Sequence, residues 1–171
     1  MGGYEFVAKL ALTAVAAYYA TTLAVWFGHW FAHKPQSPTR GFHMLGHHAI
    51  YPSSKKTRHS GDVYVSGEGR TNSAYSLLPS LGVELASAAL VLPWQWTLFF
   101  MGEMVVLLVI INHVHEQFHA QKSWLWRFGW FRLARDRHDI HHDRPRNFMV
   151  ADHLWDRCFR TFEPARKRSM E

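Results

Sequence analysis

The sequence of 171 residues contains a single cysteine, Cys158, and this scarcity restricts its chemistry. One cysteine forms no internal disulfide, and it supports neither a Cys-ligated zinc site nor an iron–sulfur cluster, which need several thiolates. Any metal in this chain must therefore be held by nitrogen and oxygen ligands. The sequence also lacks internal repeats and low-complexity tracts, so its length predicts one domain, residues 1–171.

Long apolar runs, by contrast, are prominent, at residues 6–27, 75–92 and 94–111. As a helix, the first run would rise roughly 33 Å, which is enough to cross a hydrocarbon core about 30 Å thick. No signal-peptide cleavage pattern follows it. Pro93 alone separates the second run from the third, which predicts a tight transmembrane hairpin. We expect an all-α fold, namely an integral membrane helical bundle of three spans with a helical, histidine-rich cap at residues 29–74 and 113–171.

The positions of lysine and arginine predict how these spans are oriented. Six lie in residues 34–70 and twelve in residues 113–171, whereas the N-terminal flank and the Pro93 turn carry none. Cationic flanks stay on the cytoplasmic side of a membrane. We therefore expect the N-terminus outside, with the cap and the C-terminus in the cytoplasm. Orientation explains the formal net charge of +6, so nucleic-acid binding is not expected.

Within the cap, residues 123–137 predict one interfacial helix. Aromatic residues alternate there with Arg127, Arg132 and Arg135, a mixture typical of a helix that lies in the headgroup plane. The alternative is a buried core helix.

The thirteen histidines give the strongest signal, since all lie outside the three apolar runs. Residues three or four apart share one face of a helix, so two imidazoles at that spacing can bind one metal ion. Four sets have this spacing, and one ion takes four to six ligands, so ten histidines fit two ions better than one. The predicted metal ligands are His29, His33, His43, His47, His48, His115, His119, His138, His141 and His142.

Three further histidines have weaker patterns. His113 is two residues from His115 and would point to another helix face, so we interpret it as a ligand neighbour or interface residue. His59 lies in a segment rich in Ser, Gly, Lys and Thr and is a candidate ligand, while His153 is interpreted as structural.

Four motifs occur in chain order: His29-Trp-Phe-Ala-His33, His43-Met-Leu-Gly-His47-His48, His115-Glu-Gln-Phe-His119 and His138-Asp-Ile-His141-His142. A closing segment follows, with Asn147-Phe148, Leu154-Trp155-Asp156-Arg157 and Phe159-Arg160-Thr161. Over roughly residues 25–162, this series resembles the histidine boxes and closing segment of the fatty acid hydroxylase/sterol desaturase superfamily. The sequence departs from that pattern twice. In the second motif, three residues separate His43 from the His47-His48 pair, where many members have two. Arg160 stands at the usual glycine position.

The resemblance implies a dinuclear iron site under a cytosolic cap, at the mouth of a hydrophobic channel between the spans. It implies O2 as co-substrate and hydroxylation or desaturation of an acyl chain, sterol or carotenoid. It also implies a separate electron donor, such as ferredoxin or cytochrome b5. Imidazole is a good iron ligand, and zinc can occupy such sites in purified protein.

Carboxylates near the motifs are candidates for a supporting role. Ligand histidines usually donate their second N–H to a carboxylate or carbonyl, so we expect partners or additional ligands among Glu116, Asp139, Asp143, Asp152 and Asp156. A surface ion pair is the alternative for each.

Glu84 and Glu103 lie inside the second and third apolar runs, almost symmetric about Pro93. An ionisable side chain inside a membrane is costly and suggests function, so both are candidates for a substrate channel. A hydrogen-bonded pair that joins the two spans is the alternative.

Two other functions remain in view. A zinc-dependent membrane hydrolase would usually use three protein ligands and a water, which leaves most of the histidines without a role. A histidine-rich metal transporter or sensor would usually place ionisable groups near the bilayer midplane, whereas these histidines lie at or beyond the span ends.

Overall fold

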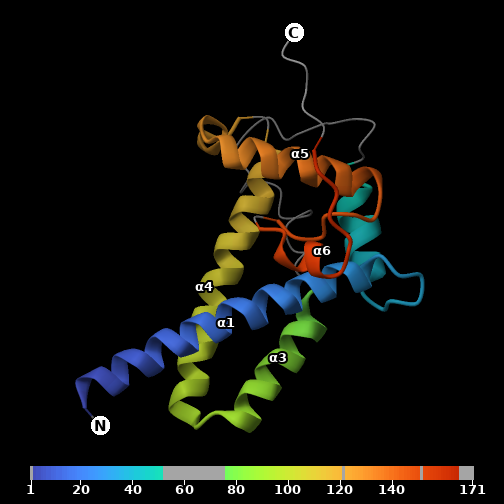
Figure 1. The fold of residues 1–171 in the computed structure, drawn as a ribbon. Helices are drawn as coiled ribbons and strands as arrows, with labels where there is room; N and C mark the ends of the chain where they lie inside the picture. Colours follow the sequence, from blue (N-terminus) through green and yellow to red (C-terminus); the bar gives the residue numbers. More distant parts are fainter. Residues whose placement is uncertain (1, 52–75, 121, 151, 166–171) are drawn as a thin grey trace.

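The computed structural model describes residues 2–51, 76–120, 122–150 and 152–165, and these residues form an all-helical fold without strands (Figure 1). In chain order the helices are α1 (Gly3–Ala32), η1 (Gly41–His48), α3 (Leu78–Val91), α4 (Trp94–His119), η3 (Trp124–Arg127), α5 (Gly129–Asp143) and α6 (Leu154–Cys158). The all-α prediction is confirmed for this part of the chain.

Two helices, α1 and α4, are long and apolar enough to cross a membrane. Their 30 and 26 residues rise about 45 and 39 Å. The predicted span at residues 75–92 forms the shorter α3, whose 14 residues rise about 21 Å. Its start is fixed by Pro79 in the first turn, where a missing backbone N–H costs nothing. Length and composition thus identify two candidate spans and a third, shorter apolar helix.

The helices α3 and α4 form a hairpin at Pro93, and α1 packs across both (Figure 1). Ala17, Ala88 and Phe100 form the core where the three meet. The helices α1 and α3 pack closely at Gly28, because a Cβ atom there would lie 2.5 Å from Ser80 Oγ. Glycine therefore lets α3 lie directly against the end of α1.

The predicted single helix over residues 123–137 is wrong. The chain forms the short 3-10 helix η3 and then α5, with Phe128 in an extended conformation between them. The Ser123 hydroxyl accepts a hydrogen bond from the Leu125 N–H and so caps η3. The two elements pack on the end of α4 through a core that includes Phe118, Leu125 and Phe131.

The C-terminal segment folds back onto α1. Trp26 stacks on Phe159 with ring centroids 4.3 Å apart, and it shares a core with Phe148. Two residues here have positive φ, Asn147 at 52° and Arg160 at 58°. Asparagine tolerates this conformation, whereas for arginine it is strained. Arg160 therefore stands at a left-handed position, which glycine adopts without strain.

Candidate metal centre

The structure brings all ten predicted histidine ligands to one end of the molecule, where α1, η1, α4 and α5 converge. Nine of them form two groups, and within each group the ligand nitrogens all lie within 4.8 Å of one another. The first histidine group is His29, His33, His43, His48 and His141. The second histidine group is His47, His115, His119 and His138. The tenth, His142, places its Nε2 atom 3.0 Å from that of His138.

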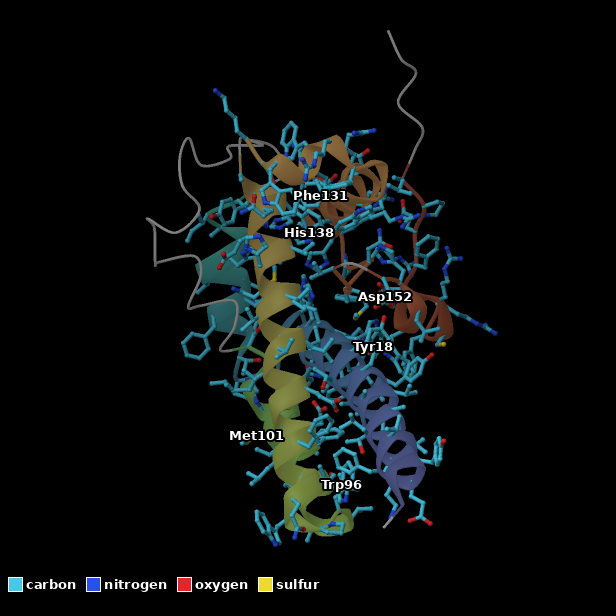
Figure 2. All side chains as sticks on the ribbon, turned by 90° about the vertical axis from the view of Figure 1, so that its left-hand side faces the viewer. Tyr18, Trp96, Met101, Phe131, His138 and Asp152 are labelled. Atoms are coloured by element: carbon cyan, nitrogen blue, oxygen red, sulfur yellow. The ribbon has the colours of Figure 1, made fainter. Side chains whose placement is uncertain are left out.

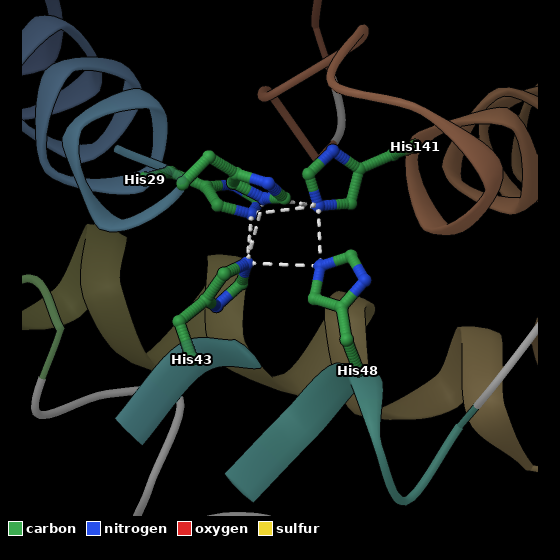
Figure 3. A group of neighbouring side chains, drawn as sticks. His29, His43, His48 and His141 are labelled. Carbon is green, nitrogen blue, oxygen red and sulfur yellow. Dashed lines mark hydrogen bonds between the residues drawn. The ribbon is translucent and has the colours of Figure 1, made fainter. Parts of the chain in front are cut away.

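In the first histidine group, the side chains come from three elements and point at one centre (Figure 3). His43 Nε2 lies 3.0 Å from His29 Nε2, 3.0 Å from His33 Nε2 and 3.1 Å from His48 Nε2. His141 Nε2 lies 2.9, 3.3 and 3.2 Å from the same three atoms. His43 and His141 are thus each close to all three of the others.

These distances suit ligands of one metal ion. Two ligand nitrogens about 2.1 Å from an ion, with their bonds at right angles, lie about 3.0 Å apart. The contacts of 2.9–3.3 Å that His43 and His141 make to His29, His33 and His48 are close to this value. The five nitrogens of the first histidine group would therefore hold a single ion.

Hydrogen-bond partners fix where the protons of two of these imidazoles lie. His29 Nδ1 contacts the Phe148 carbonyl, and His141 Nδ1 lies 2.9 Å from the Arg146 carbonyl. A carbonyl oxygen only accepts, so both Nδ1 atoms are donors and, in neutral imidazole, both Nε2 atoms carry a lone pair. These two Nε2 atoms nevertheless lie 2.9 Å apart. Two lone pairs repel at that distance, whereas a cation between them stabilises both.

The second histidine group has buried nitrogens aimed at a common point. His138 Nε2 lies 3.0 Å from His119 Nε2. Among the described residues, His47 Nε2 and His115 Nε2 are buried and have no hydrogen-bond partner. A buried nitrogen without a partner is costly, and a metal ion would satisfy each of these. With His142 beside His138, this group also has enough donors for one ion.

Helical spacing groups two of the four sets correctly and two wrongly. The set on α5 is divided, with His138 in the second histidine group and His141 in the first. His29 and His33 share the first histidine group, and His115 and His119 share the second. The expected His43–His47 pair is split, because η1 is a π-helix. Its repeat brings residues five apart onto one face, so His43 joins His48, and His47 faces the other group.

Burial lowers the pKa of these imidazoles, and neighbouring imidazoles lower it further. The pKa of His48 falls to about 3 and that of His142 to about 2. The pKa values of His43, His47, His138 and His141 also lie well below 6.5. The imidazoles are therefore neutral at pH 7, which is the form that binds metal ions.

Asp156 organises the loop that holds His29 and His141. Its carboxylate is fully buried and accepts hydrogen bonds from the N–H groups of Phe148 and Met149, at 2.9 and 3.0 Å. It also accepts from side chains of three residues: Trp26, His153 and Thr161. Burial alone would raise the pKa of Asp156, but these hydrogen bonds outweigh it and lower the pKa. Asp156 thus acts on His29 through the Phe148–Met149 peptide rather than by direct contact.

Among the residues that the structure describes, the other predicted carboxylates belong to neither histidine group. Glu116 is buried and accepts from the Asn112 amide at 2.9 Å. Asp152 accepts from the Tyr18 hydroxyl at 2.9 Å. Asp139 is half-buried and Asp143 is exposed.

An apolar cavity of about 420 Å³ opens onto the histidines between α1, α3 and α4. Its wall includes His29 and His43 of the first histidine group and His115 of the second. The remaining wall is mainly aliphatic, with Asn112 and His113 as polar residues beside the histidines. His113 thus lies at the cavity rather than in either group.

Glu84 lines a separate, larger cavity of about 1020 Å³ between α1 and α3. It accepts a hydrogen bond from the Thr21 hydroxyl at 2.7 Å, so this bond joins α3 to α1. Glu103 is half-buried on α4 and belongs to the wall of neither cavity. His59 lies outside the described residues.

Several supporting groups were not found from the sequence. The Phe148 and Arg146 carbonyls give no sequence signal, because every residue has a carbonyl. Asn147 is buried and anchors the same loop, with its amide nitrogen 3.2 Å from the Arg137 carbonyl. Tyr51 stacks on His119 with centroids 4.0 Å apart.

Searches of protein-family models, of curated proteins and of solved structures find no match to this chain. The arrangement of its side chains is therefore the basis for any functional conclusion.

Proposed function

We propose that this chain is a membrane oxygenase with two iron ions, of the fatty acid hydroxylase/sterol desaturase type. It uses O2 to hydroxylate or desaturate a lipid-like substrate, such as an acyl chain, a sterol or a carotenoid. The observation that carries the proposal is the convergence of two groups of neutral imidazoles beside an apolar cavity, with histidines of both groups in its wall.

The ligand set favours this chemistry over zinc hydrolysis. A catalytic zinc usually has three protein ligands and one water, whereas the first histidine group alone offers five nitrogens. Imidazole-rich sites suit iron, and iron bound there would supply the O2 chemistry that breaks an unactivated C–H bond.

The chain's own residues supply the surroundings of that reaction. The aliphatic wall of the 420 Å³ cavity excludes water and accepts an apolar substrate segment beside His43 and His115. The Phe148 and Arg146 carbonyls keep the Nδ1 protons of His29 and His141, so that Nε2 of each faces the metal position.

The position of the histidines favours an oxygenase over a transporter. Transport sites usually lie near the bilayer midplane. His115 and His119 lie in the last two turns of α4, and His29 lies in the last turn of α1. If these helices span the membrane, the histidines lie at its surface, where a lipid in the bilayer can reach them.

We also propose three spans, with α3 as the third, the N-terminus outside and the histidine-rich end in the cytoplasm. Cys158 is the only cysteine and is exposed on α6, which packs against α1. A membrane-impermeant maleimide should therefore modify it in inverted vesicles and leave it unmodified in intact cells. The matched control is Gly2→Cys in a Cys158→Ser background, for which the opposite labelling is expected. Labelling of Cys158 from outside the cell would contradict the orientation.

The experiment that tests the metal centre is iron content per chain, after expression with added iron and anaerobic purification. We expect about two irons per chain, because the histidine ligands form two groups and each group has enough nitrogens for one ion. His119→Ala and His142→Ala should lower the content, whereas His113→Ala, which removes a histidine outside both groups, should retain it. A single tightly held zinc, without iron uptake on reconstitution, would contradict the proposal and favour a hydrolase.

A further inference from the structure

The end of the molecule above the histidines carries an exposed surface of aromatic and basic side chains. Trp124 and Trp130 are 59% and 50% exposed. The Arg127 guanidinium lies 5.0 Å from the Trp124 ring centroid and 4.8 Å from that of Phe128. We call this surface the aromatic–basic face, and it consists of Lys122, Trp124, Arg127, Phe128, Trp130 and Arg132.

The charge of this face has one sign. Residues 120–135 contain four basic residues and neither aspartate nor glutamate, and the first acidic residue beyond them is the half-buried Asp136. Three of the basic side chains are exposed: Lys122, Arg127 and Arg132. Tryptophan and arginine are enriched where proteins bind one another, and a surface of one sign attracts a partner of the opposite sign. The face therefore fits an acidic protein.

The aromatic–basic face is connected to the second histidine group by aromatic rings in contact. Trp130 packs edge-on against the buried Phe131, with centroids 5.7 Å apart. Phe131 lies 5.1 Å from Phe118, which lies 5.3 Å from His138. Figure 2 shows Phe131 and His138 together at this end of the molecule. Three short ring-to-ring steps thus join an exposed indole to a histidine of the metal centre.

The location of the face distinguishes a protein partner from a lipid surface. The helix α5 lies across the end of α4 that is opposite the Pro93 turn (Figure 1). The apolar side chains that a bilayer would cover lie on the α3–α4 hairpin, such as Leu90, Val91 and Val106. A membrane around that hairpin leaves η3 and α5, at the other end of α4, to the aqueous phase.

We propose that the aromatic–basic face docks an acidic one-electron carrier protein, and that its electrons reach the metal centre through Trp130, Phe131 and Phe118. This inference rests on the proposed oxygenase function. Hydroxylation converts R–H, O2, two electrons and two protons into R–OH and water, so the carrier is oxidised twice in each cycle. A small exposed patch is the size of surface that transient electron-transfer partners use.

The test uses iron-loaded protein in nanodiscs of neutral lipid and reduced plant-type [2Fe–2S] ferredoxin as the acidic carrier. We expect the second-order rate of iron reduction to fall as salt is raised. Arg127→Glu combined with Arg132→Glu should lower this rate at least tenfold, while reduction by dithionite is unchanged. Arg40→Glu, which changes an exposed arginine at the N-cap of η1, is the control and should leave both rates near wild type.

Trp130→Leu tests the path separately from docking. It should lower the rate of reduction at saturating ferredoxin several-fold, while the ferredoxin concentration at half-maximal rate stays within about twofold. A change in the half-maximal concentration alone would assign Trp130 to docking and overturn the path.

The remaining outcomes also decide the proposal. Wild-type ferredoxin rates in the Arg127/Arg132 double variant would overturn it, and so would an equal loss with dithionite, which would place the damage at the metal centre. Loss of binding to phosphatidylglycerol vesicles with unchanged ferredoxin rates would assign the face to lipid headgroups. If no reducible iron is found, the oxygenase proposal fails. Salt-sensitive ferredoxin binding to wild type, lost in the double variant and measured by calorimetry, still tests the docking face.

Discussion

The Asp156 carboxylate is the group whose replacement should disturb the metal centre most without touching a ligand. In Asp156→Asn the shape is kept, but one oxygen becomes an NH2 group. If the amide oxygen takes the place of Oδ1, the NH2 group takes the place of Oδ2. In the wild-type chain, Oδ2 accepts hydrogen bonds from the Met149 N–H and the His153 Nδ1–H. Two buried donors are then left facing a third donor.

The size of the effect follows from those two donors. Each buried group without a partner costs about 1–3 kcal/mol, so the folded state should lose about 2–6 kcal/mol. The peptide group between Phe148 and Met149 links Asp156 to His29, because its N–H, on Met149, donates to the carboxylate and its carbonyl, on Phe148, accepts from Nδ1 of His29. Loss of such a supporting bond typically lowers metal affinity about 10–100-fold. We expect Asp156→Asn to do the same.

The assay is a titration of the iron-loaded protein with a competing chelator, together with its thermal unfolding. Asp152→Asn is the control, since Asp152 bonds to Tyr18 and the Leu154 N–H and lies outside the histidine groups. Its iron affinity should stay within about twofold of wild type. If Asp156→Asn also retained wild-type affinity and unfolding temperature, the role assigned to the Phe148–Met149 peptide would be refuted.

Three other predictions concern the fold and its response to acid. Arg160→Gly should raise stability by about 0.5–1 kcal/mol, because relief of a left-handed conformation at φ 58° exceeds the added flexibility of the unfolded chain; an unchanged or lower unfolding temperature would argue against it. Gly28→Ala should destabilise by about 1 kcal/mol, since its Cβ would meet Ser80, whereas Gly82→Ala, which has open space, should not; equal effects of the two would count against the close packing of α1 on α3. The metal-free protein should lose stability as pH falls below 6.5. In the folded state the pKa values of His48 and His142 are about 3 and 2, so both stay neutral, whereas in the unfolded chain both bind protons. Each of these two groups contributes a loss of about 1.4 kcal/mol at pH 5.5, and equal unfolding temperatures at pH 5.5 and 7.5 would contradict this.

The sequence predicts the local part of the metal centre well, because histidine spacing on a helix is a local property. His115 and His119 share a face of α4, and the two residues enter one group as expected. The assignment of His141 and His138 to different groups depends on how α5 crosses α1 and α4, and no local pattern contains that crossing. The same holds for the bond from Trp26 to Asp156, which joins residues 130 positions apart.

The fold is predictable to a similar extent. The apolar runs at residues 6–27 and 94–111 lie within α1 and α4, whose ends continue into the histidine motifs. The run at residues 75–92 overestimates α3, because hydropathy does not register that Pro79 favours a helix start at Leu78. The break at Phe128 is similarly invisible, since aromatic residues suit both a helix and the extended link that is found.

The π-helix η1 also has a consequence for how this motif tolerates changes in length. In η1, His43 and His48 are five positions apart, and their Nε2 atoms lie 3.1 Å from each other. An α-helix achieves the same juxtaposition with four positions. The wider repeat therefore accommodates one more residue between two facing histidines than an α-helix does. Deletion of Leu45 should thus return the segment to an α-helix and keep both imidazoles in place. The length of the segment can therefore vary by one residue while the ligand geometry does not.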